Sequence, residues 1–189
     1  STTSWPVIFD QPSTATLPQA RMWGPRSIFL PVVLAFLLLP VVEHLFGLTS
    51  DITLLELSDL NRPLLRRLQL EASGTYHHSM VVGSLAERAA EAIGANSLLA
   101  RVSAYYHDIG KISKPEYYNE NILPHVRNPH EKLSPNMSTL IVKSHLNDGL
   151  ELARREHLPR AVRAAIPEHH GTMAMTFFYG KALEQDPGA

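Results

Sequence analysis

His107 and Asp108 are adjacent at the end of an apolar run, and Gly110 and Lys111 follow closely. Neighbouring imidazole and carboxylate groups can direct nitrogen and oxygen ligands into one cavity, and a carboxylate has two oxygens with which to bridge two cations. A His-Asp dipeptide by itself is a weak motif. The pair therefore predicts a metal site only if other histidines join it.

The composition limits which ligands are available. The chain has 189 residues, ten histidines and no cysteine, so imidazole and carboxylate are its candidate ligands. The lack of disulfides fits a reducing compartment. A net charge of -1 gives no overall basic field, which argues against DNA or RNA polymers as partners.

Several histidines fall at the ends of predicted helices. Helix bundles build metal sites from side chains of facing helices, and nitrogen and oxygen donors suit Fe, Mn or Zn. A single helical histidine is usually a surface or hydrogen-bonded residue, but a set at converging helix ends fits a metal centre better. The candidates are His78, His107 with Asp108, His145, and His169 with His170.

The elements that must position these residues are all predicted to be helical. From Gly74 onward, apolar residues recur at three- and four-residue steps without strand alternation, which indicates an all-α fold. We expect a helix cap at Ser97, and a helix from Ser134 to about Leu146 with a bend at residues 147–149. Residues 112–134 read as a long loop, and such loops in compact domains are usually functional.

The sequence predicts five segments. Residues 1–26 read as a leader that is disordered or was introduced by cloning, and 27–48 as a transmembrane helix, although the fifteen-residue apolar run from Ile28 to Val42 is shorter than the roughly twenty that a span needs. A buried core helix is the alternative. A connector over 49–62, a helical domain over 63–182 and a polar tail over 183–189 follow.

The order of the histidines resembles the HD-domain metallophosphohydrolase superfamily. A closer similarity, from about Val32 to Lys181, is to the cytoplasmic HD domain of the PgpH-type seven-transmembrane HD receptors. The blocks that carry it are LLELSDLNRPLLRRL, GTYHHSMVVGSLAERAAEAIGAN, YYHDIGKISKPEYYNEN, NPHEKLSP and HHGT.

This resemblance implies an HD-domain helical bundle preceded by one transmembrane helix, the last of a receptor, over 27–48. It implies a bacterial cytoplasmic membrane location, with the HD domain facing the cytoplasm. Asp108 would be catalytic and bridge two divalent transition metals, Fe or Mn, and Lys111 would be catalytic and bind substrate phosphate; a solvated lysine is the alternative. The implied metal ligands are His78 (with His77 as the adjacent alternative), His107, Asp108, His145, His169 and His170.

The activity implied by the resemblance is hydrolysis of cyclic di-AMP to pApA through a metal-activated water. The implied partners are a cyclic dinucleotide, the membrane through residues 27–48, and a second copy in a homodimer. Three alternatives stay open: a cyclic di-GMP phosphodiesterase, an HD-type nucleotidohydrolase, and a non-catalytic nucleotide-binding sensor. The first is disfavoured, because Gly171 and Thr172 follow the histidine pair where a Gly-Tyr-Pro element is expected.

The chain also departs from the family pattern. A further aspartate ligand is expected on a later helix, and Asp186 lies too close to His170 to supply it. We therefore expect a C-terminally truncated domain that binds one metal tightly and the other weakly or not at all, with an inactive fragment as the alternative to an active enzyme. His44, His125, His130 and His157 receive no functional role, but the loop over 119–132 is expected to line the substrate cleft, with Arg127 and Lys132 as its test residues.

Overall fold

The computed structural model describes residues 25–185, apart from the side chains of residues 25–28, 43 and 44. The chain divides into two compact units, Ser1–Val41 and Val42–Ala189. The predicted leader up to residue 24, the end of the predicted tail and Asp186 lie outside the described residues, and so does the side chain of His44.

The first helix, α1 (Pro25–Phe46), contains Pro31 and Pro40. Its described apolar side chains are largely exposed. Among the helices of the described residues, none has the length and apolar character needed to cross a membrane. The prediction of a transmembrane helix over 27–48 is thus not confirmed by the described residues.

The second unit consists of helices, and residues 25–185 contain no strand, which confirms the all-α prediction. Four short 3-10 helices occupy the predicted loop after Asp108. In chain order the remaining elements are α2 (Asp51–Leu57), α3 (Pro63–Glu71), α4 (Ser73–Ala92), α5 (Ser97–Tyr106), η1 (Ile109–Ser113), η2 (Pro115–Tyr117), η3 (Asn119–Asn121), η4 (Pro129–Lys132), α6 (Pro135–Arg155), α7 (Arg160–Glu168) and α8 (Thr176–Gln185).

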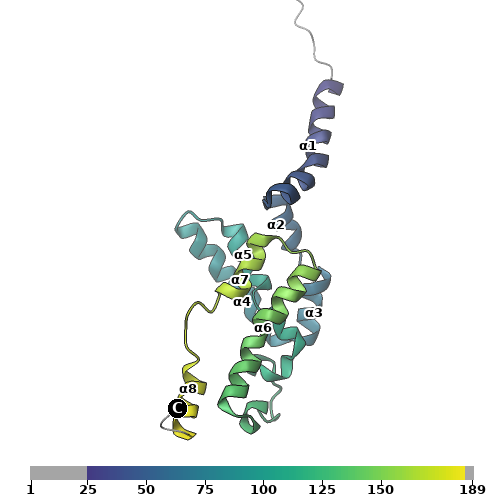
Figure 1. The fold of residues 1–189 in the computed structure, drawn as a ribbon. Coiled ribbons are helices and arrows are strands. Elements are labelled where there is room, and N and C mark those ends of the chain that lie inside the picture. Colours follow the sequence, from purple (N-terminus) through teal and green to yellow (C-terminus); the bar gives the residue numbers. More distant parts are fainter. Residues whose placement is uncertain (1–24, 186–189) are drawn as a thin grey trace, which may run out of the picture. The chain divides into compact units, whose positions relative to one another are not determined.

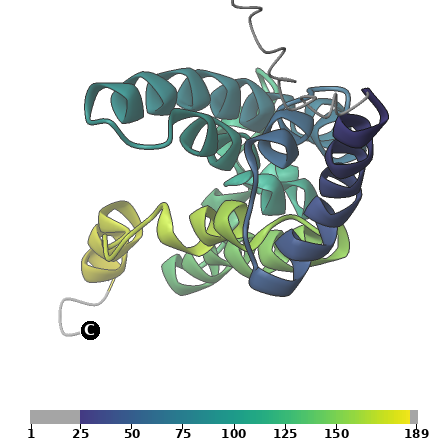
Figure 2. The ribbon, with the colours of Figure 1, turned by 90° about the horizontal axis from the view of Figure 1, so that it is seen from above.

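The helices pack around α5. α4 and α5 lie side by side as a helical hairpin (Figure 2), and α7 packs against α5 from another direction. The long helix α6, whose course is visible in Figure 1, packs against η1. The buried core includes Leu65 and Leu68 of α3, Val102 and Tyr106 of α5, and Ile166 of α7. The chain segment after α5 thus lies where α6 and α7 meet.

Local sequence explains where several helices begin. Ser134 caps α6 by accepting a hydrogen bond from the Met137 amide at 3.3 Å, and Pro135 occupies the first turn. α5 is capped one residue earlier than predicted, because the side-chain oxygen of Asn96 accepts from the Leu99 amide at 2.8 Å. The predicted connector over 49–62 contains α2, which Ser50 caps.

The predicted bend at residues 147–149 is wrong, because α6 runs without interruption from Pro135 to Arg155. Gly149 serves helix packing and does not break the helix. A Cβ atom on Gly110 would lie 1.9 Å from the His145 carbonyl oxygen and 2.5 Å from the Gly149 amide nitrogen. The paired glycines therefore let α6 approach η1 at backbone distance, which carries His145 up to Asp108.

Candidate metal centre

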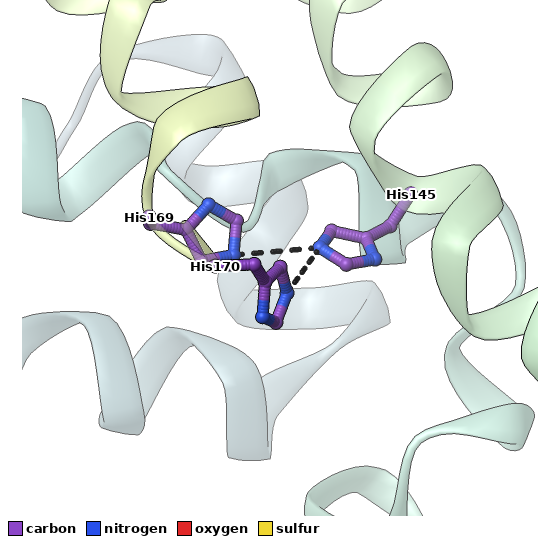
Figure 3. A group of neighbouring side chains, drawn as sticks. All are labelled: His145, His169 and His170. Atoms are coloured by element: carbon purple, nitrogen blue, oxygen red, sulfur yellow. Dashed lines mark hydrogen bonds between the residues drawn. The ribbon is translucent and has the colours of Figure 1, made fainter. Parts of the chain in front are cut away.

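Four elements deliver the predicted ligands to one region. α5 ends at Tyr106, so His107 occupies its C-cap position and Asp108 begins the turn into η1. His145 projects from α6, and His169 and His170 follow the end of α7 (Figure 3). α4 contributes His78, whose ring centroid lies 5.4 Å from that of His107.

The ligand atoms form two groups, in each of which the candidate atoms lie within 4.8 Å of one another. One group combines His78, His107 and Asp108, and the other combines His145, His169 and His170. The structure thus brings together every histidine and carboxylate predicted as a ligand. His78, and not its neighbour His77, belongs to the cluster among the described residues.

Asp108 belongs to the first group and also faces the second. It turns Oδ2 toward His107 of its own group and Oδ1 toward His145 and His169 of the other. Its Oδ2 is 3.1 Å from Nε2 of His107 and 2.8 Å from Nζ of Lys111. Its Oδ1 is 3.5 Å from Nε2 of both His145 and His169, and this buried atom accepts no hydrogen bond. A carboxylate placed in this way has the geometry to bridge two cations.

Backbone carbonyls set the tautomers of three of these histidines. Nδ1 of His107 lies 2.7 Å from the Ala104 oxygen, Nδ1 of His169 lies 2.8 Å from the Ile166 oxygen, and Nδ1 of His145 contacts the Val142 oxygen. A carbonyl only accepts, so each Nδ1 must donate its N–H. The neutral rings of His145 and His169 therefore direct unprotonated Nε2 atoms toward the cluster, as metal-ligating histidines with ordered outer partners do.

The converging Nε2 atoms of His145, His169 and His170 favour a positive charge between them. Nε2 of His145 lies 3.5 Å from Nε2 of His169 and 3.2 Å from that of His170 (Figure 3). Two unprotonated nitrogens cannot donate to each other, and neither can donate to Oδ1 of Asp108. A cation resolves this arrangement, and the donor set of imidazole and carboxylate suits a first-row transition metal. The residues present therefore fit the predicted metals.

The protonation states favour the same interpretation. Burial acts to raise the pKa of Asp108, but the hydrogen bond and charge of His107 and the charge of Lys111 outweigh it and hold that pKa well below its usual range. Burial lowers the pKa of His145, His169 and His170. The site thus favours an ionised Asp108 and neutral imidazoles at His145, His169 and His170, which are the forms that bind metals.

Lys111 is part of this site and is not a solvated lysine. Its side chain is 14% exposed, and its Nζ lies between Asp108 and Oε1 of Glu120, 2.7 Å away. Burial acts to lower the pKa of Lys111, but both carboxylates outweigh it and raise that pKa. The lysine therefore stays charged at the edge of the metal cluster.

Two cavities adjoin the cluster, and His145 and His170 line both of them. The larger has a volume of about 620 Å³ and is lined by the segment between His170 and α8, including Met173 and Met175. The smaller, about 390 Å³, contains Lys111 together with residues of the long loop. Aromatic side chains contribute to the cavity walls; they are Tyr117 and Tyr118 of the smaller cavity, and Phe177 and Phe178 of both.

The loop over 119–132, which was expected to line the substrate cleft, contributes to the smaller cavity, but the sequence interpretation assigned no individual role to two of its residues there. His130 is buried, and its Nε2 donates to the Tyr117 oxygen at 2.9 Å. Glu120 pairs with Lys111. The Asn128-Pro129 pair, which caps and opens η4, is the sequence signal that could have marked His130 as ordered. Arg127 and Lys132 are exposed and do not line either cavity.

Comparison with known proteins agrees with this geometry. The HD-domain sequence profile matches residues 75–189, which include all of the clustered ligands. The chain belongs to the HD-domain family. It is 48% identical over 164 residues to the cyclic-di-AMP phosphodiesterase PgpH of Bacillus subtilis, covering 87% of this chain and 23% of that protein.

Two further similarities involve Listeria monocytogenes. Its cyclic-di-AMP phosphodiesterase PgpH is 46% identical over 149 residues, covering 79% of this chain and 21% of that protein. The crystal structure of the L. monocytogenes PgpH HD domain in complex with cyclic-di-AMP has a TM-score of 0.66 and 46% identity, covering 70% of this chain and 61% of that one. The chain thus spans less than a quarter of the length of the curated relatives.

Proposed function

We propose that this HD domain hydrolyses cyclic di-AMP to pApA. The observation that carries the proposal is the convergence of unprotonated histidine nitrogens and both Asp108 oxygens beside a cavity that contains a charged lysine. Supporting it, two relatives with 46–48% identity are named cyclic-di-AMP phosphodiesterases. The intact ligand cluster favours an enzyme over a non-catalytic sensor.

The residues of the two groups would hold two divalent transition metals, with iron or manganese as the proposed ions. Bound there, the metals would supply Lewis-acid activation of water and stabilise charge on phosphate oxygens. The ligands are His78, His107 and Asp108 on one side, and His145, His169 and His170 on the other.

The remaining parts of the site suit a cyclic dinucleotide. The ammonium of Lys111 can contact a phosphate oxygen as a compact charge. Tyr117 and Tyr118 in one cavity, and Phe177 and Phe178 shared by both, offer faces on which purine rings can stack. In the net reaction one phosphorus–oxygen bond to a ribose 3′ oxygen breaks and one to the oxygen of water forms. The released alkoxide takes up a proton, which gives the linear product.

The test combines metal analysis with a substrate panel. The 189-residue chain is loaded with Fe²⁺ or Mn²⁺, and products from cyclic di-AMP, cyclic di-GMP and nucleoside triphosphates are separated by chromatography. We expect the protein to contain transition metal. We also expect it to hydrolyse cyclic di-AMP in preference to cyclic di-GMP and the triphosphates, with pApA as the main product. His145→Ala should abolish both, whereas His125→Ala, which alters an exposed loop histidine, should retain both.

Three outcomes would contradict the proposal. Turnover of triphosphates in preference to cyclic di-AMP would make the chain a nucleotidohydrolase. Tight binding of cyclic di-AMP by the metal-loaded chain without hydrolysis would make it a sensor. Equal hydrolysis by the parent and His145→Ala would place the chemistry elsewhere.

The same proposal places the longer protein at the bacterial cytoplasmic membrane as a seven-transmembrane HD receptor, with this domain in the cytoplasm. Supporting it is the sequence resemblance, which extends from about Val32 to Lys181. Fractionation of cells that express the full-length protein tests this location. The homodimer remains a prediction, for which sedimentation of the purified chain is the measurement.

A further inference from the structure

Lys111 is held by two carboxylates of different exposure. Asp108 is almost fully buried, whereas the side chain of Glu120 is 32% exposed and lines the smaller cavity. The ammonium has three N–H donors, of which these contacts at 2.8 and 2.7 Å use two. The third can serve a ligand in the cavity that Lys111 also lines.

Glu120 is itself fixed by a buried threonine. The hydroxyl of Thr75 donates to Oε1 of Glu120 at 3.1 Å and accepts from Nδ2 of Asn121 at 2.9 Å. The amide of Thr75 donates to Oδ1 of Asn121 at 3.0 Å. Thr75 is fully buried, so the orientation of Glu120 is set by the first turn of α4.

Gly74 makes this arrangement sterically feasible. A Cβ atom at this position would lie 1.8 Å from the carbonyl oxygen of Glu120. The start of α4 and the 3-10 helix η3 therefore meet at backbone distance, and this contact brings Glu120 close enough to reach Lys111. The network joins α4, η1 and η3 at one wall of the cavity.

We propose that Glu120 is a positioning residue, which holds the Lys111 ammonium in the cavity wall so that its remaining N–H meets a substrate phosphate. The inference rests on the proposed hydrolysis, in which Lys111 contacts phosphate. Without Glu120, the long lysine side chain would regain rotamer freedom and collapse toward Asp108. Glu120 itself does not touch the reacting atoms.

A competing explanation predicts a different kinetic result. A carboxylate that merely neighbours an anionic substrate repels it, so its removal should lower KM and leave kcat unchanged. Loss of positioning should instead lower kcat, because the phosphate contact is needed most where charge develops in the transition state. The separation of kcat from KM therefore distinguishes the two roles.

The experiment uses the 189-residue metal-loaded chain with cyclic di-AMP. We expect Glu120→Ala to lower kcat roughly ten- to a hundredfold, the scale of a misplaced catalytic contact, with KM unchanged or lower. Glu120→Gln, which keeps an acceptor oxygen but not the charge, should give an intermediate loss. Glu116→Gln is the matched control, because it removes an exposed carboxylate of the same loop, and it should leave kcat within about twofold.

A double-mutant cycle tests whether Glu120 acts through Lys111. In a Lys111→Met background, Glu120→Ala should cause no further loss of kcat. An additional loss of the same size as in the parent would overturn the proposal, and so would an unchanged kcat in Glu120→Ala. Should the alanine variant fail to fold, Glu120→Gln carries the same comparison.

A substrate-independent readout separates this inference from the proposed function. In the metal-free chain, the ¹⁵N-detected ammonium signal of Lys111, assigned with Lys111→Arg, should show slow hydrogen exchange. Glu120→Gln should weaken that protection, and Glu116→Gln should not. If the parent hydrolyses no cyclic di-AMP, the proposed function fails while this signal still decides the positioning. An unprotected ammonium in the parent would refute the positioning by itself.

Discussion

Gly110 and Gly149 meet at backbone distance, with the Cα of Gly110 3.5 Å from the point where a Cβ atom on Gly149 would lie. Gly110 stands two residues after Asp108, and Gly149 stands four residues after His145. The contact between these glycines therefore fixes the separation of two proposed metal ligands. The same close approach thus serves both the packing of α6 on η1 and the placement of His145 beside Asp108.

Gly110→Ala should disrupt both the packing of α6 on η1 and the placement of the proposed metal ligands. Its Cβ would overlap the His145 carbonyl oxygen at 1.9 Å, so α6 must move away from η1. We expect a loss of about 3 kcal/mol in the free energy of unfolding, at the upper end for overpacked sites, together with reduced metal content. Denaturant titration and metal analysis measure the two effects. Gly180→Ala in α8, where no atom lies within 4 Å of the added Cβ, should be neutral or slightly stabilising.

Asp108→Asn should remove the bridge while keeping the side-chain shape. The amide retains one oxygen acceptor but loses the charge that faces both histidine groups. We expect metal affinity and cyclic di-AMP hydrolysis to fall by more than about a hundredfold. This exceeds the roughly ten- to hundredfold loss that follows when a residue supporting a metal ligand is removed. Calorimetric metal titration is the measurement. Retention of two metals per chain would contradict the bridging role.

Tyr106 should make the domain sensitive to alkali. Burial raises the pKa of Tyr106 to about 12, and its hydroxyl donates to the Leu57 oxygen at 2.9 Å. Because the unfolded tyrosine ionises near pH 10, this stabilisation is complete below pH 10 and is lost as pH rises through about 12.

Tyr106→Phe should therefore reduce the free energy of unfolding by about 1–2 kcal/mol at neutral pH and flatten its decline above pH 10. Urea titrations at pH 7 to 11 measure both effects. Tyr179→Phe, which alters an exposed tyrosine, should leave the stability at neutral pH unchanged. If the free energy of unfolding declined equally steeply above pH 10 in the parent and in Tyr106→Phe, Tyr106 would not be the source of the alkali sensitivity.

His130 should support the substrate cavity through the loop that carries it. Its bond to the Tyr117 oxygen ties η4 to η2, both beside the smaller cavity. His130→Ala should lower the free energy of unfolding by about 1–3 kcal/mol and raise KM for cyclic di-AMP. Arg127→Ala alters an exposed side chain outside the cavities and should change neither. A raised KM in Arg127→Ala alone would restore the expectation that Arg127 lines the substrate cleft.

The sequence was most informative where chemistry and helical periodicity coincide. The predicted ligands, from His78 to His170, come together because most of them lie near helix ends that the apolar pattern places against the core. His145 is the exception, since it lies in the middle of α6 and reaches Asp108 through the close approach of α6 to η1. The all-α fold follows from the same pattern. Side-chain types at regular spacing thus predicted which residues meet.

Predictions that depended on tertiary contact were less accurate. Asn147, Asp148 and Gly149 favour a turn locally, but packing of Gly149 on Gly110 keeps α6 continuous. Glu120 and His130 lie in a stretch without helical period, and their partners, Lys111 and Tyr117, are identified only by the folded loop. The transmembrane prediction for 27–48 relied on apolar composition, and no helix of the described residues meets the requirements for a membrane span.

The carbonyl contacts of His107, His145 and His169 have a consequence for metal exchange. Because α5, α6 and α7 already orient these rings, a metal ion meets ligands that are ordered before it arrives. In zinc fingers, by contrast, metal binding and folding are one event. We therefore expect that a bound metal can be removed without unfolding the domain. The ion that occupies the site would then be decided by ligand preference and cellular supply, independently of the stability of the fold.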